Sequence, residues 1–536
     1  MNFRMILPID PIKRKTHSTK KSSVVLQSPV QRQLDLEIVQ QAATRRGLRQ
    51  TENHNKDSNP RRNMNDQITV PKVSCPFGLD NLPFPINHWR RSMFRPISLI
   101  LSFAFLFGST GVQAGALAFV GAHIIPIEGE EIASGALVIE DGVISAVGPA
   151  GGVEIPRDAE VVDATGKVIM PGLVDTHSHI GGARAADSSG PIQPGVRILD
   201  AVNIFDAGYR RAVAGGLTTL NVMPGSGHLS SGQTIYLKMR RVGDDGIHSP
   251  EELAYTAEDD DGHLRVLGGL KMANGTNSRR KPPFPGTRGK SAFLVRQRFI
   301  QAQEYRDKIV AANGDPTKLP PRDLDLETLV EVLEGKRVVH HHTHRADDIM
   351  TVLRLSKEFD FKVVLHHVSE GWKVAAQIAA AGVPCSVIMI DSPGGKHEAV
   401  GLQMETGAIL AEAGALMAYH TDDWITDSRL FFRAAALGVR GGLSRRDALA
   451  SLTINGAAML DLDDRVGSLS PGKDADFIIL DGDPLSVYTR VLQTWVEGKK
   501  VFDLDDPDDR LHAVGGQGAG KDQEPFFCCF DHGGTS

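Results

Sequence analysis

Histidines gather where apolar segments of this sequence end. Nine of the 19 histidines fall into four short groups, each at or just after the end of an apolar run. The groups are His177 and His179; His340, His341, His342 and His344; His366 and His367; and His420. Neutral imidazole is a common ligand of metal ions in proteins. Packing alone does not explain such clustering, which favours a metal site.

The spacing within two groups predicts which side chains share a face. Alternate residues of a strand point to the same side, so His177 and His179 should lie together. The same alternation places His340, His342 and His344 on one face. An isolated pair of this kind usually binds nothing, and part of the longer run could be a solvated loop. The apolar strand before His177 favours the metal interpretation.

The last two histidine groups are an adjacent pair and a single histidine that is followed by an aspartate. Of the adjacent residues His366 and His367, only one is expected to face inward. Asp422 comes two residues after His420, where a carboxylate could bind a metal ion and accept a proton from a metal-bound water. A helix N-cap is the alternative role for Asp422, and Asp423 is its neighbouring competitor.

The elements that carry these residues alternate in type. Apolar strands are predicted at 168–174, 217–222, 266–271, 338–342, 362–365, 383–390 and 415–419, with helices such as 346–358, 372–381 and 445–452. This alternation predicts a parallel α/β fold, for which a (β/α)8 TIM barrel has the right size. In such a barrel the C-terminal strand ends meet at one mouth. A doubly wound sheet is the competitor, although no G-x-G-x-x-G follows the first strand.

Short alternating strands with turns flank this central region on both sides. They fill 116–168, with a hairpin predicted at Asp141-Gly142, and return in 467–503. Neither flank has enough strands for a stable sheet alone. We therefore predict a small β-sandwich domain built from both flanks of the barrel.

Composition excludes several classes of protein. The chain has 536 residues with 41% hydrophobic and 23% charged residues and a net charge of -6, and its mean hydropathy is -0.16. These values exclude a multi-span membrane protein and a wholly disordered chain. Four cysteines are too few for a disulfide scaffold, and the 55 glycines show no collagen period.

The N-terminal region differs from the rest. Residues 1–92 hold 16 Lys and Arg against seven Asp and Glu and have little apolar periodicity, which predicts disorder. A basic flank, an apolar run over 97–107 and a Val-Gln-Ala end then match a secretory signal peptide that begins near Met93. We interpret 1–92 as an over-extended reading frame and expect a periplasmic or secreted enzyme. A single membrane anchor with a basic cytoplasmic tail is the alternative.

These predictions divide the chain into six parts. They are 1–92, disordered; 93–114, the signal peptide; 115–167, the first β part; 168–465, the barrel; 466–505, the second β part; and 506–536, a flexible tail.

Three segments carry a family pattern: 168–179 (VIMPGLVDTHSH), 342–349 (HTHRADDI) and 466–476 (VGSLSPGKDAD). On these segments the chain resembles the metal-dependent amidohydrolase superfamily, in its imidazolonepropionase-like and prolidase-like branch. The resemblance covers roughly 116–503, and the first and third segments together are quite specific to the superfamily.

The resemblance implies roles for individual residues. His177 and His179 correspond to the metal ligands of the first strand, and His342 and His367 to those of the fifth and sixth strands. Asp422 corresponds to the aspartate of the eighth strand, which is both ligand and general base.

One further residue, Lys271, is carried over less directly. Lys271 stands where many relatives have a carboxylated lysine that bridges two metal ions, and pairing with a substrate carboxylate is its alternative role. Apart from the resemblance, Arg345 lies next to a ligand strand and is expected to contact substrate or to support a ligand. A spare histidine, His344 or His420, could contact substrate and stabilise a tetrahedral oxyanion, with a structural role as the alternative.

The expected function is metal-assisted hydrolysis of a carbon–nitrogen bond in an amide or cyclic amide. Zn2+ suits the ligand types, Fe2+ or Mn2+ also fit, and the choice between one and two ions stays open. A metal-free scaffold and a deaminase on the same fold are the alternatives. The expected partner is a small amide or peptide-like substrate and no nucleic acid, with a homo-oligomer left open.

Overall fold

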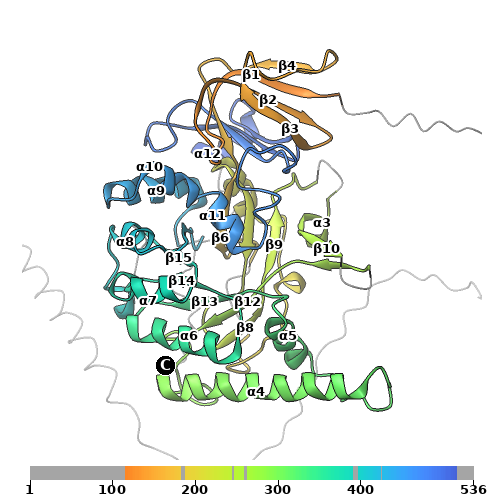
Figure 1. Cartoon of the computed structure of the whole chain (residues 1–536), viewed down its shortest axis with the longest axis vertical. Coiled ribbons are helices and arrows are strands. Elements are labelled where there is room, and N and C mark those ends of the chain that lie inside the picture. The colour runs from red at the N-terminus through yellow and green to blue at the C-terminus, as the bar shows by residue number, and fades with distance from the viewer. Residues whose placement is uncertain are drawn as a thin grey trace, which may run out of the picture. The chain divides into compact units, whose positions relative to one another are not determined.

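The computed structural model describes residues 115–182, 187–243, 247–258, 262–389, 396–423 and 425–515 (Figure 1). All of them belong to one of the chain's two units, Phe105–Ser536. The predicted segments 1–92 and 93–114 and residues 516–536 of the predicted tail lie outside the described residues. Across the described ranges, no helix combines the length and the apolar character that a bilayer crossing requires.

Strands from both flanks of the chain form one eight-stranded sheet. The N-terminal flank supplies β1 (Leu117–Ile124), β2 (Ile132–Glu140), β3 (Val143–Pro149), β4 (Glu160–Asp163) and β5 (Val168–Pro171). The C-terminal flank supplies β17 (Phe477–Leu480), β18 (Val491–Val496) and β19 (Lys499–Asp503). The order is β19-β18-β17-β5-β1-β2-β3, and β4 pairs with β1. Antiparallel pairing of β5 with β17 joins the two flanks.

This sheet curls over its own core. Phe119 of β1 meets Phe477 of β17 and Trp495 of β18 with ring centroids 5.1 and 5.3 Å apart. Strands β5 and β17 separate β1 from β18 in the sheet, and a flat sheet would hold strands that far apart at about 14 Å. The rings can touch only because the sheet bends. That this sheet forms a two-layered sandwich stays a prediction, as do the positions of the domain boundaries.

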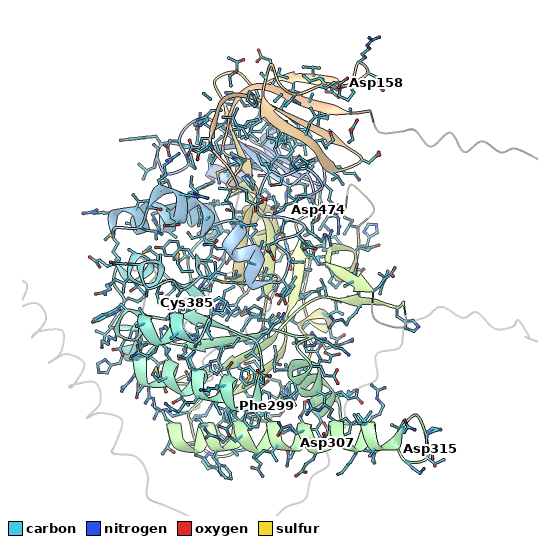
Figure 2. The ribbon with its side chains drawn as sticks, viewed as in Figure 1. Asp158, Phe299, Asp307, Asp315, Cys385 and Asp474 are labelled. Carbon is cyan, nitrogen blue, oxygen red and sulfur yellow. The ribbon has the colours of Figure 1, made fainter. Side chains whose placement is uncertain are left out.

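A buried lysine ties this sheet to the central region. Lys238, at the end of β9 (Ile235–Lys238), is fully buried and pairs with Asp474, with Asp476 at 3.2 Å and with Glu497 at 3.6 Å. Asp474 is labelled in Figure 2. A buried charge needs such partners, because desolvation without them costs several kcal/mol. Two acids of the third family segment therefore hold the two parts of the chain together.

Parallel strands form most of the central region, which makes the fold mixed α/β. β12 (Leu270–Ala273), β13 (Val339–Thr343), β14 (Val363–His367), β15 (Cys385–Val387) and β16 (Met417–Tyr419) pair side by side and all run parallel. β6 (Leu173–Ser178) and β7 (Leu217–Val222) form a second parallel pair. These strands agree with the predicted alternation.

The segment between β7 and β12 departs from the parallel prediction. β8 (Ser230–Gln233) pairs antiparallel with β12, and β9 pairs antiparallel with β7. Only seven residues connect β7 to β8, whereas a parallel crossover needs a dozen or more. The chain therefore returns in the opposite direction.

Hydrogen bonds close the arrangement. The backbone N–H of His179 donates to the carbonyl of Asp423 at 2.7 Å, and that of Asp422 donates to the carbonyl of His177 at 2.9 Å. These bonds place the end of β6 beside the segment that follows β16. Because β8 continues into β9 through Thr234, the strands follow one another from β6 to β16 and return to β6.

Helices cover the outside of these strands (Figure 1). α6 packs on β13, and α8 packs on β15 and β16. Three predicted helices are present, as α6, as η2 with α7, and as α10. The α-helices are α2 (Ala207–Ala214), α3 (Pro250–Leu253), α4 (Arg288–Ala312), α5 (Leu324–Leu333), α6 (Ala346–Phe359), α7 (Ala375–Ala380), α8 (Thr406–Glu412), α9 (Phe431–Arg440), α10 (Arg445–Ala450), α11 (Ile454–Met459) and α12 (Pro507–Val514). Short 3-10 turns are η1 (Ile198–Asp200), η2 (Gly371–Lys373), η3 (His397–Ala399) and η4 (Ser428–Leu430), and β10 (Thr256–Glu258) pairs with β11 (Leu264–Val266).

Helix α12 occupies the start of the segment predicted as a flexible tail. Asp506 caps it, accepting hydrogen bonds from the N–H groups of Asp508 and Asp509, and Pro507 suits its first turn. Asp509 is buried and pairs with Arg210 at 2.9 Å. For residues 507–514 the prediction of a flexible tail was therefore wrong.

Candidate functional site

All nine histidines of the four sequence groups are buried, none more than 6% exposed. The groups lie in or just after β6, β13, β14 and β16, and the second of them runs from the second residue of β13 to the residue that follows the strand. Seven of the nine fall into three candidate metal-binding groups, and within each group the ligand atoms lie within 4.8 Å of one another. The structure thus brings together residues that are far apart in the sequence.

The first of these is the histidine–carboxylate group, made of His177, His179 and Asp422. The Oδ1 atom of Asp422 lies 3.4 Å from Nε2 of His177 and 3.1 Å from Nε2 of His179. The Nδ1 atom of His179 lies 2.7 Å from the carbonyl oxygen of Met223, which fixes the ring. Asp422 has a positive φ of 52°, a conformation that aspartate tolerates better than most residues.

Lys271 lies next to this group. Its Nζ atom is 2.9 Å from Nε2 of His177 and 2.9 Å from Sδ of Met223. The side chain is fully buried in β12. Burial lowers the pKa of Lys271 to about 7, because a charged amine is costly away from water.

The second is the three-imidazole group, made of His342, His344 and His367. The ring centroid of His342 lies 4.2 Å from that of His367 and 4.7 Å from that of His344. Both ring nitrogens of His342 and the Nε2 atoms of His344 and His367 are buried and lack a hydrogen-bond partner. Such nitrogens normally find a partner when buried.

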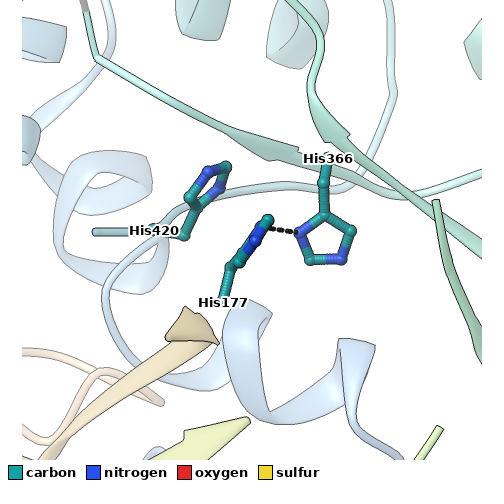
Figure 3. A group of neighbouring side chains, drawn as sticks. All are labelled: His177, His366 and His420. Carbon is teal, nitrogen blue, oxygen red and sulfur yellow. Dashed lines mark hydrogen bonds between the residues drawn. The ribbon is translucent and has the colours of Figure 1, made fainter. Parts of the chain in front are cut away.

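Figure 3 shows the third group, His177, His366 and His420. The Nδ1 atoms of His177 and His366 are 3.1 Å apart, and the ring of His177 stacks on that of His420 at 4.8 Å. From His366 the hydrogen bonds continue to His340 at 3.0 Å and from there to the hydroxyl of Tyr236 at 2.9 Å. His177, His366, His340 and Tyr236 thus form one continuous chain of hydrogen-bonded side chains.

The prediction that only one of His366 and His367 faces inward was wrong. Both rings approach His177, with centroids 4.8 and 4.9 Å away. His367 and Val368 have positive φ values of 71° and 53°, so the backbone leaves the regular pleat at the end of β14. Two neighbouring side chains can then reach the same space.

Burial keeps these imidazoles neutral. It lowers the pKa values of His342, His366 and His367 well below 6.5, and those of His344 and His420 to about 3. A neutral imidazole keeps a free lone pair for a cation. The nitrogen-rich donor set and the unpartnered ring nitrogens therefore fit a divalent transition metal.

Asp422 is ionised beside them. Burial opposes its charge, but the hydrogen bond from His179 leaves the pKa of Asp422 below its usual value. Its side chain is 15% exposed, whereas His177 is fully enclosed. An ionised carboxylate that opens toward solvent can serve as a ligand or as a base.

A second aspartate, Asp175, lies in the first family segment, and the sequence assigns it no role. It accepts hydrogen bonds from the N–H groups of His177 at 3.1 Å and Thr421 at 3.2 Å, and from the Thr421 hydroxyl. Burial raises the pKa of Asp175 to about 7. Asp175 thereby ties the strand of His177 to the residue before Asp422. The signal in the sequence for this role was the position of Asp175 two residues before His177.

Asp423 and Arg345 are not members of the three candidate metal-binding groups. Asp423 accepts hydrogen bonds from the N–H group of Ser428 at 3.0 Å and from its hydroxyl, which is a structural role. Arg345 is 46% exposed and forms a two-pronged ion pair with Asp347 at 2.9 and 3.1 Å. A substrate role for Arg345 stays a prediction.

Comparison with known proteins places the chain in a family. The amidohydrolase family matches residues 200–502, more than half of the chain. The chain belongs to the amidohydrolase family. A solved amidohydrolase from Thermotoga maritima is 32% identical, with a TM-score of 0.64 over 72% of this chain and 100% of the other.

Two curated relatives support the same family. Amidohydrolase tasK of Hapsidospora irregularis is 28% identical over 69% of this amidohydrolase, which spans only 40% of tasK. Imidazolonepropionase of Deinococcus radiodurans is 26% identical over 66% of the chain and 86% of the relative. Membership confirms the predicted family and enzyme class, a metal-dependent hydrolase of carbon–nitrogen bonds.

Proposed function

We propose that this amidohydrolase is a zinc enzyme that hydrolyses amide or cyclic amide bonds in small or peptide-like molecules. The observation that carries the proposal is the convergence of His177, His179 and Asp422, with Asp422 ionised and partly open to solvent. Imidazole nitrogens and one carboxylate are a ligand set that suits Zn2+.

The proposed fold is a (β/α)8 barrel with a small β domain. The ring of strand pairings from β6 to β16 and back to β6 supports the barrel, with the antiparallel β8–β9 segment in the third position. The sheet shared by both flanks supports the β domain. In a barrel, residues that follow the parallel strands meet at one mouth.

Within this site, the proposed ligands are His177, His179, Lys271, His342, His367 and Asp422. Lys271 is included because a pKa of about 7 leaves much of its amine neutral near neutral pH, and a neutral amine can donate a lone pair. The lysine borders the histidine–carboxylate group through His177.

The residues of the chain divide the work of the reaction. A bound metal ion would polarise the scissile carbonyl and lower the pKa of water. Asp422 accepts the proton of the attacking water and returns it to the leaving nitrogen. Asp175 accepts hydrogen bonds from the N–H groups of His177 and of Thr421, the residue before Asp422, which keeps the base in position.

The test is metal analysis and turnover of the full chain expressed with added zinc. Linear N-acyl amino acids, dipeptides, lactams and hydantoins form the substrate panel, and released amine or opened ring is measured. Metal bound in at least stoichiometric amount together with hydrolysis of one class supports the proposal. Ammonia release from an aromatic amine alone would favour a deaminase. Absence of both metal and turnover would favour a scaffold.

We also propose that the enzyme works outside the cytoplasm. The basic flank and apolar run that follow Met93 support this. N-terminal sequencing of protein isolated from its native cells should find a mature chain that starts near Gly115. A mature chain that keeps residues 1–92 would contradict the proposal.

A further inference from the structure

A cavity between α9, α12 and the connection from β17 to β18 takes no part in the proposed reaction. It holds about 420 Å³, within the range of about 300–1,000 Å³ that is typical of ligand-binding cavities. The end of α2 and η4 complete its walls. No member of the three candidate metal-binding groups is among the described residues that line it. An occupant of this α9–α12 cavity would therefore bind away from the histidines.

Most of the residues that line the α9–α12 cavity are apolar. Leu480 and Leu504 are buried parts of the lining, whereas Val487 is 80% and Val514 is 59% exposed. Tyr488, the neighbour of Val487, is also exposed. Single exposed apolar residues are common on protein surfaces, but a group of them around a cavity is typical of a binding surface.

The charged residues of the lining are all basic. They are Arg429, Arg433 and Arg490, and no acid is among the described residues of the lining. Arg429 pairs with Asp427 at 2.6 Å and Arg490 with Asp481 at 2.9 Å, which holds these two arginines in place. An occupant with both apolar side chains and negative charge would therefore match the cavity.

The chain itself leaves α12 at the wall of this cavity. Ala513 and Val514, the last two residues of α12, belong to the lining. The guanidinium of Arg429 donates to the carbonyl of His512 at 3.0 Å, which fixes the end of the helix beside the cavity. The residues that follow α12 in the sequence therefore start next to the cavity.

The sequence after α12 contains a segment of matching chemistry. Residues 525–531 read PFFCCFD and have three phenylalanines within five residues, whereas aromatic residues make up 6% of the whole chain. Asp522, Glu524 and Asp531 accompany these phenylalanines, and Lys521 is the one lysine or arginine of 515–531. This aromatic segment, 525–531, combines apolar side chains with a surplus of negative charge, as the cavity requires.

The connection from α12 is long enough for the aromatic segment to return. Ten residues, 515–524, separate the two, and four of them are glycine. A glycine-rich chain of ten residues spans about 16–19 Å on average and about 36 Å at most. Because both ends of this connection would lie at the same cavity, the entropy cost of closing so short a loop is small.

We propose that the aromatic segment 525–531 docks in the α9–α12 cavity of the same chain. Its phenylalanine side chains lie against the apolar lining, and its acids lie near the arginines. Docking covers Val487 and Val514, which are otherwise exposed. Burial of each phenylalanine side chain favours the docked state by about tenfold or more.

The test uses the cysteines of the aromatic segment, Cys528 and Cys529, to trap the docked state. Val487→Cys places a thiol in the lining of the cavity, where the docked segment can reach it. Asp508→Cys is the matched control, because Asp508 is exposed, lies about 9 Å along α12 from Val514, and is not part of the lining.

A third variant combines Val487→Cys with Phe526→Ser, Phe527→Ser and Phe530→Ser. It keeps both cysteines and the length of the connection but removes the aromatic side chains. Each purified full-length protein is treated with oxidised glutathione, and mass spectrometry follows the disulfide between the introduced thiol and Cys528 or Cys529. Val487→Cys should form this disulfide at least about tenfold faster than either the control or the third variant.

Hydrogen–deuterium exchange adds a measurement without new cysteines. In the parent, backbone amides of residues 484–491 should exchange more slowly than in a variant truncated after Gly515, because the docked segment covers them. Circular dichroism of every variant checks that the fold is kept, and none of the substitutions lies in the candidate site.

The outcomes identify the occupant of the cavity. Equal rates of disulfide formation with and without the phenylalanines would overturn the proposal. A disulfide that joins two chains, seen as a dimer on a non-reducing gel, would mean that a second copy supplies the segment and would overturn docking within one chain. Unchanged exchange at 484–491 after truncation would mean that the cavity is left for a foreign ligand, and would overturn the proposal as well.

Discussion

Replacing the carboxylate of Asp422 by an amide is the most direct test of the proposed chemistry. Asp422→Asn keeps the size of the side chain and the backbone hydrogen bond to the carbonyl of His177 at 2.9 Å. It removes the negative charge that lies 3.1 and 3.4 Å from the two imidazoles of its group. The fold should therefore survive while the base is lost.

The magnitude follows from the role assigned to this carboxylate. A positioned general base contributes about 10²- to 10⁴-fold to a rate, which is about 3 to 5 kcal/mol of transition-state stabilisation. Turnover of Asp422→Asn should fall by that factor. It is measured at a zinc concentration where elemental analysis shows the same metal content as in the parent, so that weaker metal binding does not enter the rate.

Asp423→Asn is the matched control because the neighbouring carboxylate accepts its hydrogen bonds from Ser428. Turnover should stay near that of the parent, although the melting temperature can drop. If Asp422→Asn kept more than about a tenth of the turnover, or if Asp423→Asn lost as much while still folded, the assignment of Asp422 as the base would be wrong.

Three further predictions concern metal, pH and the backbone. His177→Ala should lose metal and turnover together, because its Nε2 lies 3.4 Å from Asp422; parent-level turnover would contradict the ligand assignment. Metal-free protein should lose stability as the pH falls below about 6.5. The buried histidines hold pKa values below 6.5, so the unfolded state binds more protons, at about 1.4 kcal/mol per histidine and pH unit; urea midpoints that stay constant down to about pH 5 would refute this. Gly268→Ala should lower the melting temperature, since its Cβ would lie 1.9 Å from the carbonyl oxygen of Thr234; Gly289→Ala, in an open position in the first turn of α4, is the control and should not lower it.

The strands that carry the site could be predicted because each is a short apolar run that ends in polar residues. The runs before His177, His342 and His367 stand out from their surroundings, and the structure has β6, β13 and β14 there. The return of the C-terminal flank into the same sheet as β5 was also predictable, because neither flank could form a sheet alone.

Other features left no such trace in the sequence. The β8 strand reads Ser230-Ser231-Gly232-Gln233 and has no apolar residue, so its antiparallel pairing with β12 was missed. The simultaneous approach of His366 and His367 to His177 depends on positive φ values at the end of β14. Backbone conformation at a single residue is set by tertiary contacts, and residue type alone does not predict it when the residue is not glycine.

The histidine-rich interior explains why the site can be both polar and well ordered. An apolar core would hold His177 by packing alone, whereas here its Nδ1 meets His366, which meets His340, which meets Tyr236. Each neutral imidazole has one N–H group, so if Nε2 of His177 binds a cation, its Nδ1 must donate to His366. The same direction of donation then follows along the whole chain of rings. Residues far from any substrate, such as Tyr236, thus help to decide which nitrogen of His177 is free. The geometry of the site is therefore set by hydrogen bonds that reach from the strand ends down into the core.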